Sequence, residues 1–224
     1  NGKSTTCQLL YEVLKQQGYD VKLAGNIGYP ILSIKNVTHK TIFVIEASSY
    51  QLDYSKLFKS KYAVLLNISI DHIERHKTLN NYISAKFKLI KNQNQNSVAF
   101  INKNNLHIQK NLKKNSYISK IIKVETKINK KILKNIENDY FLSASNQENL
   151  SFVFEISKKF KVKKSILFSV VKRFTGLKFR QQIIFNSNNL LIVNDSKSTS
   201  YSSSIETLKQ FENIYWLLGG IAKK

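Results

Sequence analysis

The first residues of the chain combine a glycine, a lysine and hydroxyl side chains in the order that phosphate-binding loops use. Asn1-Gly2-Lys3-Ser4-Thr5 matches the closing half of the pattern G-x-x-x-x-G-K-[ST]. In that pattern backbone N–H groups surround the phosphates, the lysine reaches the β and γ oxygens, and the hydroxyl ligates Mg²⁺. An ordinary turn before a helix is the competing interpretation. Leucines at helical spacing between Leu9 and Leu14, stopping at Gly18, favour the loop, because a helix N-terminus suits an anion.

A carboxylate and two serines follow the apolar run 41–45. Glu46 stands where that run ends, and a nucleotide-bound Mg²⁺ needs hard oxygen ligands of this kind. The competing interpretation is that Ser48 or Ser49 caps a helix while Glu46 is merely solvated. Both interpretations stay open from the sequence.

Two more loops and one lysine carry polar groups of interest. The turn 25–30 presents the Asn26 amide, although a plain turn is the simpler interpretation. Residues 67–76 gather two histidines and two acids, among them His72, after an apolar run, and this density favours a functional loop. Lys86, taken alone, would be interpreted as one more exposed lysine of a helix.

Short apolar runs alternate with helical patterns along residues 1–176. Strands are expected at 41–45, 62–66 and 97–101, and helices at 79–91, 146–160 and 164–173. Such runs are typical of buried parallel strands in an α/β sheet. Ligands of such sheets bind beyond the carboxyl ends of the strands, where Glu46 and Asn67 fall. We therefore expect a P-loop-type, mostly parallel sheet flanked by helices, forming an ATP-binding domain over residues 1–176.

The pattern restarts at residue 177. A strand pair at 182–185 and 190–193, a helix at 203–211 and a strand at 214–218 are expected. Residues 194–200 end the strand pair with donors and acceptors together, and a capped helix start is the competing explanation. We expect residues 177–224 to begin a second, Rossmann-like α/β domain, and the chain to be part of a longer protein.

The formal net charge of +22 raises the question of nucleic-acid binding, since lysine and arginine neutralise phosphates. The lysines are spread along the whole chain, with the densest stretch at 110–134, and the excess is nearly all lysine rather than arginine. Compositional drift, with a basic surface as its by-product, explains the charge better. We expect no nucleic-acid partner.

The remaining composition is that of a globular protein. Hydrophobic residues make up 42% of the chain, enough to bury a core. The single cysteine, Cys7, excludes an internal disulfide and a cysteine-rich metal site. No apolar run reaches membrane-spanning length, so we expect no membrane partner. A cytoplasmic location fits the single cysteine, and we expect a monomer.

Taken in order, these stretches resemble the Mur ligase family over nearly the whole chain. The matching segments are the loop from Asn1, G-N-I-G-x-P at 25–30, E-x-S-S-[FY]-Q-L at 46–52, D-H-x-x-R-H/Y at 71–76, A-K at 85–86, N-D-S-K-[AS]-T at 194–199 and G-G-x-x-K at 219–223. Two motifs depart from the family. Ser145 replaces the histidine of H-N-x-x-N, and Lys178 and Phe179 replace the proline and histidine of the G-L-P-H-R hinge.

The resemblance implies an ATP-dependent amide ligase of peptidoglycan precursor synthesis. Segments 25–30 and 46–52 are most similar to members that attach D-glutamate to UDP-N-acetylmuramoyl-L-alanine. There the alanyl carboxylate takes the γ-phosphoryl group of ATP to form an acyl phosphate, and the amine of D-glutamate displaces phosphate. Because two anions must meet, charge neutralisation and positioning supply most of the catalysis.

The resemblance also implies a role for individual residues. The nucleotide would be contacted by Asn1, Gly2, Lys3, Ser4, Thr5, Asn146, Asn149, Arg180 and Asp195. Two Mg²⁺ ions would be held by Ser4, Glu46, His72 and Lys86. In the family the lysine matching Lys86 is carbamylated, which turns a cation into an oxygen ligand. Catalytic residues would be Lys3, His72, Lys86, Lys197 and Lys223, and substrate contacts Asn26, His72, Thr199 and Lys223.

Two other functions stay open. Another Mur-type ligase or a folylpolyglutamate synthase would share the loop and the modified lysine, but segments 25–30 and 46–52 point away from them. A nucleic-acid-stimulated P-loop ATPase is indicated only by the charge. We expect the chain by itself to be inactive, because the family's N-terminal domain and most of its C-terminal domain lie outside it.

Overall fold

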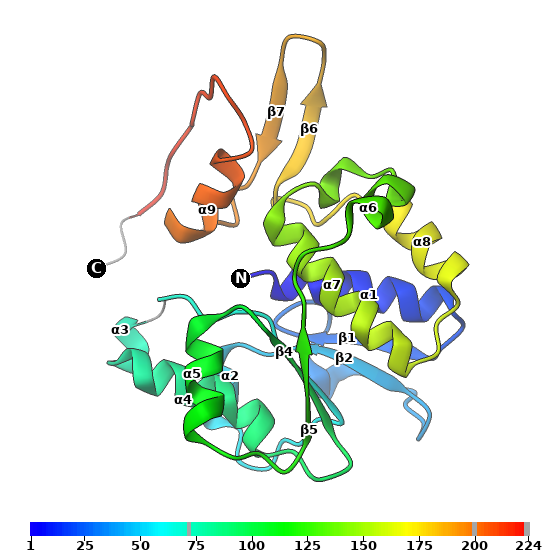
Figure 1. Cartoon of the computed structure of the whole chain (residues 1–224), viewed down its shortest axis with the longest axis vertical. Coiled ribbons are helices and arrows are strands. Elements are labelled where there is room, and N and C mark those ends of the chain that lie inside the picture. The colour runs from blue at the N-terminus through cyan, green and yellow to red at the C-terminus, as the bar shows by residue number, and fades with distance from the viewer. Residues whose placement is uncertain (71–72, 199–200, 222–224) are drawn as a thin grey trace. The chain divides into compact units, whose positions relative to one another are not determined.

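Two compact units make up the chain in a computed structural model that describes residues 1–70, 73–198 and 201–221. They are Asn1–Leu177 and Lys178–Lys224 (Figure 1). The first unit holds parallel strands flanked by helices, which confirms the expected fold class. The second holds an antiparallel strand pair and a helix.

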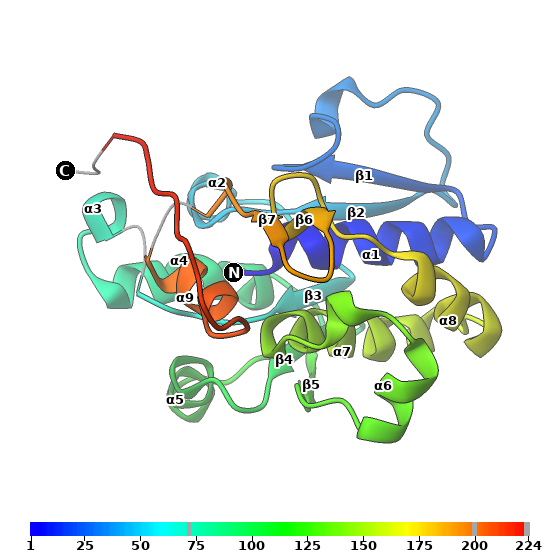
Figure 2. The ribbon, with the colours of Figure 1, turned by 90° about the horizontal axis from the view of Figure 1, so that it is seen from above.

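Helix α1 (Lys3–Gln16) begins directly after Gly2, as the sequence predicted. Leu9 and Leu14 are each 0% exposed, because helical spacing places them on one buried face. Both views show α1 beside α7 (Ala144–Lys159), against which it packs (Figure 1, Figure 2). The apolar face of α1 thereby fixes the position of the loop residues that precede it.

The strands of the first unit pair in parallel. β1 (Val21–Gly25) pairs with β2 (Ile42–Glu46), while β3 (Tyr62–Leu65), β4 (Val98–Asn102) and β5 (Lys120–Val124) form a separate sheet in that order. The predicted strands are confirmed as β2, β3 and β4. The sequence analysis missed β1 and β5 because lysines interrupt their short apolar runs.

The three-stranded sheet is covered on both faces. Val64 and Phe100 belong to the hydrophobic cluster that includes α1 and α7. Leu65 and Ile101 belong to a second cluster that includes α4 (Leu79–Lys91). Because neighbouring residues of a strand point to opposite faces, this division shows helices packed on both sides, as in other parallel sheets.

Shorter elements complete the first unit. They are α2 (Ser49–Tyr54), α3 (Ile73–His76), α5 (Leu106–Lys114), α6 (Lys130–Ile136), α8 (Lys164–Arg173), η1 (Ile31–Ser33) and η2 (Asp139–Phe141). The predicted helix at 164–173 is confirmed as α8. α5 and α6 were not predicted, because lysines and asparagines outnumber their apolar residues. In the described part of the chain, no helix combines the length and apolar content needed to cross a membrane.

The second unit contains β6 (Gln182–Asn186), β7 (Leu191–Asn194) and α9 (Tyr201–Leu208), close to where the sequence predicted them. The predicted strand at 214–218 is wrong, because these residues have no regular structure and Leu217 is 95% exposed. A strand at 214–218 would need a neighbour for its backbone hydrogen bonds. The described strands of this unit, β6 and β7, pair with each other instead. That this unit begins a Rossmann-like domain stays a prediction.

Candidate active site

Gly2 and the first turn of α1 form one end of the candidate site, where the sequence predicted a phosphate loop. Gly2 has φ 78° and occupies the N-cap position, where it has no side chain to accept the N–H groups of the first turn. Those groups therefore point to a ligand or to water. A Cβ at Gly2 would lie 2.0 Å from Oδ1 of Asn149 on α7, and the same oxygen accepts a hydrogen bond of 3.2 Å from Oγ1 of Thr6. Only glycine fits this position.

Glu46 ends β2 as a buried carboxylate, 2% exposed. Its Oε1 accepts a hydrogen bond of 3.3 Å from Nδ2 of Asn26, while Oε2 has no hydrogen-bond partner among the described residues. A buried carboxylate oxygen that lacks a donor is the kind of group that a bound cation would satisfy. The interpretation of Glu46 as a solvated side chain is therefore wrong.

The backbone of the turn after β1 holds Asn26 beside Glu46. Gly25 lies opposite Glu46 in the register of β1 and β2, and the main-chain nitrogen of Asn26 donates to the carbonyl oxygen of Glu46 at 2.9 Å. Gly25 has φ 102°, and a Cβ there would be 2.3 Å from the same oxygen. The serine-cap interpretation is correct as well, because Ser48 and Gln51 form a capping box at the start of α2. The capped helix and the buried carboxylate coexist.

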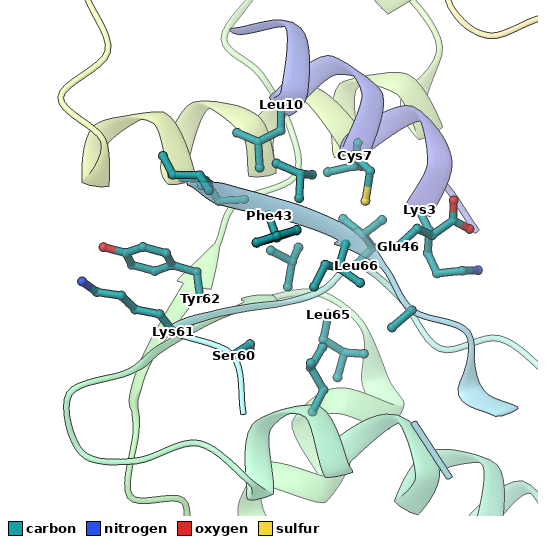
Figure 3. Close-up of a pocket in the computed structure, with 18 of the residues that line it drawn as sticks. Lys3, Cys7, Leu10, Phe43, Glu46, Ser60, Lys61, Tyr62, Leu65 and Leu66 are labelled. Atoms are coloured by element: carbon teal, nitrogen blue, oxygen red, sulfur yellow. The ribbon is translucent and has the colours of Figure 1, made fainter. Parts of the chain in front are cut away.

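The pKa of the Cys7 thiol depends on the charges of Glu46 and Lys3 at this end of the site. This pKa is raised to about 12 in total: burial is the largest cause, the negative charge of Glu46 raises it as well, and the positive charge of Lys3 lowers it. Figure 3 shows Lys3, Cys7 and Glu46 gathered at one end of a cavity. The thiol is therefore protonated at neutral pH and is not a nucleophile, whereas Lys3 and Glu46 are the charged pair available to a ligand.

Lys86 is buried on α4, 9% exposed. Its Nζ donates a hydrogen bond of 3.1 Å to the carbonyl oxygen of Asn67, which follows β3. The same Nζ lies 4.8 Å from the ring centre of Tyr82. The interpretation of Lys86 as an exposed helix lysine is wrong, since its ammonium reaches the carboxyl end of the sheet.

A half-buried glutamate that the sequence analysis did not single out joins the strand ends to α7. Oε1 of Glu148 accepts from Nδ2 of Asn67 at 2.6 Å, and Oε2 accepts from Nδ2 of Asn102 at 3.0 Å. Burial raises the pKa of Glu148, and the two amide hydrogen bonds lower it. The position of Asn102 at the end of the run 97–101 was the available signal, because residues at the carboxyl ends of neighbouring parallel strands converge.

His76, the second histidine of the loop 67–76, has a structural environment. It is 6% exposed, its Nε2 lies 3.0 Å from Oγ of Ser49, and its ring stacks on Tyr50 with centroids 5.6 Å apart. These contacts join α2 to α3. Packing between α2 and α3 therefore explains the presence of His76, one of the two histidines of this loop.

One cavity of about 850 Å³ brings four of the predicted site residues together. Asn1, Lys3, Glu46 and Lys86 all line it. Ser4 and Thr5 are buried in the first turn of α1, and Asn26 reaches the group through its hydrogen bond to Glu46.

Asn146 lies near this group but has local partners. It is 5% exposed, its main-chain nitrogen donates to the N-cap Ser143 at 3.2 Å, and its Nδ2 donates to the carbonyl oxygen of Tyr140 at 2.8 Å. Nδ2 of Asn149 lies 3.5 Å from Oδ1 of Asn146. Both asparagines therefore help to position the start of α7 against the phosphate loop.

Three predicted site residues are among the described residues of the second unit, and three others fall outside the described residues. Asp195 accepts from the Gln181 nitrogen at 3.1 Å, Oγ of Ser198 at 2.7 Å and Oγ1 of Thr207 at 3.1 Å, so its carboxylate organises this unit. Lys197 is exposed and Arg180 is partly exposed. The predictions for His72, Thr199 and Lys223 fall outside the described residues.

Comparison with known families shows to which family a chain with this fold and this candidate site belongs. The profile of the Mur ligase middle domain matches residues 1–167. Because the match covers most of the chain, this chain belongs to the Mur ligase family.

Two curated relatives are similar over the full chain. The UDP-N-acetylmuramoylalanine--D-glutamate ligase of Rickettsia bellii is 34% identical over 244 residues, covering 100% of this chain and 54% of the relative. The protein of the same name from Rickettsia felis is 36% identical over 241 residues, covering 100% of this chain and 53% of the relative. The chain thus spans about half the length of the curated relatives it matches.

Solved structures agree on the fold. MurF ligase from Thermotoga maritima in complex with ADP superposes with a TM-score of 0.71 at 17% identity, covering 95% of this chain and 56% of that chain. At this identity the similarity establishes the fold alone.

Proposed function

We propose that the full-length protein is an ATP-dependent ligase that attaches D-glutamate to UDP-N-acetylmuramoyl-L-alanine in peptidoglycan precursor synthesis. Both Rickettsia relatives bear the name of this activity, and the MurF ligase that shares the fold was solved with ADP. The observation that carries the proposal is the buried Glu46 oxygen that lacks a hydrogen-bond partner among the described residues and lines the same cavity as Lys3.

The residues present fit a magnesium nucleotide. Lys3 and the first-turn N–H groups of α1 would bind phosphate oxygens, while the Ser4 hydroxyl and the Glu46 carboxylate would hold the metal. Gly2 lets the backbone approach the phosphates without a side chain in between. When bound, Mg²⁺ supplies the charge neutralisation that lets a phosphate and a carboxylate meet.

Lys86 would serve this site as a carbamate. Its Nζ already lies at the carboxyl end of β3 through the bond to Asn67, and its side chain is 9% exposed. A carbamylated Lys86 would present anionic oxygens, which suit a second Mg²⁺. His72 stays a predicted ligand of the same ion.

The proposed reaction has two steps. A carboxylate oxygen of the alanyl group attacks the γ-phosphorus of ATP, the bond to the ADP oxygen breaks, and an acyl phosphate forms. The amine of D-glutamate then attacks the acyl carbon, phosphate leaves, and the nitrogen loses a proton. Lys3 would neutralise charge in the first step. Roles for Asn26, Arg180, Asp195, Lys197, Thr199 and Lys223 in binding substrates or nucleotide stay predictions.

The test is ADP release by the full-length protein with UDP-N-acetylmuramoyl-L-alanine and D-Glu, L-Glu, L-Lys or no amino acid. We expect turnover only with D-Glu, and a loss of about a hundredfold in Lys86→Ala. Lys88→Ala is the matched control, because Lys88 lies on the same helix and pairs with Asp53 at 2.7 Å. ADP release that ignores both substrates and rises with added nucleic acid would overturn the assignment.

Carbamylation is tested separately from turnover. Full-length protein equilibrated with ¹³C-bicarbonate should show a carbamate carbon resonance that is absent from Lys86→Ala and present in Lys88→Ala. Removal of carbon dioxide should lower the ligase rate, and added bicarbonate should restore it. A rate that is indifferent to carbon dioxide, with no carbamate resonance, would remove the modified lysine from the mechanism.

A further inference from the structure

Asn67, which follows β3, contacts two parts of the candidate site. Its carbonyl oxygen accepts the hydrogen bond of 3.1 Å from Nζ of Lys86. Its Oδ1 accepts from the main-chain nitrogen of Asn1 at 2.6 Å, and its Nδ2 donates to the carbonyl oxygen of Asn1 at 3.3 Å. In a longer chain the Asn1 nitrogen is a peptide N–H, which donates in the same way. Asn67 therefore links the predicted phosphate loop to the buried lysine.

The side-chain amides of Asn67 and Asn102 each have a fixed orientation. Asn102, at the end of β4, is 4% exposed, and its Oδ1 accepts from the main-chain nitrogen of Asn104 at 2.8 Å. A main-chain N–H can only donate, so the amide oxygen must face it and the NH₂ group must point elsewhere. Asn67 shows the same division, with its oxygen on the nitrogen of Asn1. The ends of both strands thus present an NH₂ donor.

Glu148 on α7 accepts from both of these donors. Its Oε1 lies 2.6 Å from Nδ2 of Asn67, and its Oε2 lies 3.0 Å from Nδ2 of Asn102. An ionised carboxylate has two acceptor oxygens and no donor, whereas a glutamine in the same place could accept from only one of the two amides. Hydrogen bonds to an ionised group are also stronger than neutral ones. The two amides therefore require a carboxylate at this position of α7.

We propose that Glu148 is a positioning residue, which holds the Asn67 amide in the orientation that links the predicted phosphate loop to Lys86. Asn67 lines the same cavity as Glu46 and Lys86, so Glu148 acts on the site through Asn67. If the Asn67 amide turned over, its NH₂ group would face the nitrogen of Asn1, and two donors would meet. The inference rests on the proposed function, which gives the loop and Lys86 their tasks.

Glu148→Gln in the full-length protein tests the proposal. The substitution keeps the size of the side chain, but it leaves one of the two amides facing a donor. Asn67 is the amide that we expect to turn, because Asn102 is the more deeply buried of the two. Asn1 then loses a hydrogen bond from its nitrogen, and MgATP should bind about tenfold more weakly.

A second readout follows Lys86 itself. In buffer without carbon dioxide, an amine-labelling reagent should modify Lys86 about threefold faster in Glu148→Gln than in the natural protein, because the Asn67 carbonyl oxygen is no longer held in place. Mass spectrometry of the Lys86 peptide gives the rate. Glu155→Gln, on the same helix, is the matched control. Glu155 pairs with Lys158 at 2.5 Å, so its substitution should leave both readouts unchanged.

A double-substitution cycle separates positioning from general support of the fold. Asn67→Ala should weaken MgATP binding about as much as Glu148→Gln does, and it keeps the bond between Glu148 and Asn102, so it gives an answer even where Glu148→Gln does not fold. Adding Glu148→Gln to Asn67→Ala should have no further effect. Adding Asn102→Asp to Glu148→Gln should restore binding, because the new carboxylate accepts from the introduced amide, whose oxygen then accepts from Asn67.

Natural MgATP affinity and natural Lys86 labelling in Glu148→Gln or in Asn67→Ala would overturn the proposal. So would equal effects of Glu148→Gln with and without Asn67→Ala, or a lowered melting temperature as its sole effect, which would give Glu148 a purely structural role. Neither readout uses the ligase reaction, so a protein that does not attach D-glutamate leaves the test intact. A natural protein that binds no MgATP would contradict the proposed function, and the Lys86 labelling rates would then decide.

Discussion

Asn149 lies directly against Gly2, with its Oδ1 2.0 Å from the place where a Cβ would be. The same oxygen accepts the hydroxyl of Thr6, so one side chain of α7 contacts both the loop and the first turn of α1. This arrangement positions the phosphate-loop end of α1 through tertiary packing. It also leaves no space for any other residue at position 2.

Gly2→Ala should destabilise the protein by about 1–3 kcal/mol, because alanine is strained at φ 78° and its Cβ would collide with Asn149. The collision should also displace the first turn of α1 and weaken ATP binding. Chemical denaturation and nucleotide titration measure the two effects.

Gly18→Ala separates the two causes. Gly18 also has a positive φ, 94°, but nothing lies within 4 Å of the added Cβ. It should therefore cost about 1 kcal/mol from backbone strain alone and leave ATP binding unchanged. Equal effects of the two substitutions would show that the contact with Asn149 is unimportant.

Glu46→Gln should abolish most of the stabilisation that MgATP gives. A ligand at a hundred times its Kd stabilises a protein by about 2.7 kcal/mol, and the variant should show only a small part of this at the same concentration. Its stability without ligand should stay close to that of the natural protein, because Oε2 has no hydrogen bond to lose among the described residues. Thermal unfolding with and without MgATP gives both numbers.

Glu125→Gln is the matched control for Glu46→Gln. Glu125 pairs with Lys103 at 3.0 Å, and its side chain is 50% exposed. It should keep the full response to MgATP. A Glu46→Gln protein that responds as strongly as this control would exclude Glu46 as a metal ligand.

Cys7 should make stability fall at high pH. Its pKa is raised from 9.0 to about 12 in the folded protein. Because the folded state holds this proton more tightly, the stabilisation is complete below pH 9 and is lost as the pH rises towards 12. The unfolding free energy of the natural protein should therefore drop faster across this range than that of Cys7→Ala.

Thiol labelling gives the same pKa a second readout. The natural protein should react slowly with a thiol reagent at pH 8, since the thiolate is the reactive form. Glu46→Gln should react faster, because the Glu46 charge is one of the causes that raise the Cys7 pKa. Labelling at the rate of an unfolded chain would contradict the assigned burial.

Asn138→Ala should destabilise the first unit by about 1–3 kcal/mol. Nδ2 of Asn138 donates to the carbonyl oxygens of Val171 at 2.7 Å and Phe174 at 2.8 Å, at the end of α8. Asn115→Ala is the control, because the side-chain bonds of Asn115 within the described part of the chain are local, to Asn111. Urea denaturation compares the two, and equal midpoints would count against the helix-end role.

Uninterrupted apolar spacing made α1, α4, α7 and α8 and strands β2 to β4 predictable. β1 and β5 escaped prediction because their lysines break the apolar run, and only pairing with β2 and β4 stabilises them as strands. The stretch 214–218 is the opposite case, because a strand was predicted there and none is present. Its apolar residues favour a strand, but strand formation needs a neighbour that the described part of the second unit does not provide.

The candidate phosphate-loop residues, the strand ends that carry Glu46 and Asn67, and the motifs of the family could all be predicted, because each depends on residue type and local spacing. Three other features follow from tertiary packing: Glu46 and Lys86 are buried, Asn149 packs on Gly2, and a space remains between β2 and β3. Burial and hydrogen bonding depend on which elements meet. Thr6 and Asn149, 143 positions apart, touch only because α1 and α7 pack together.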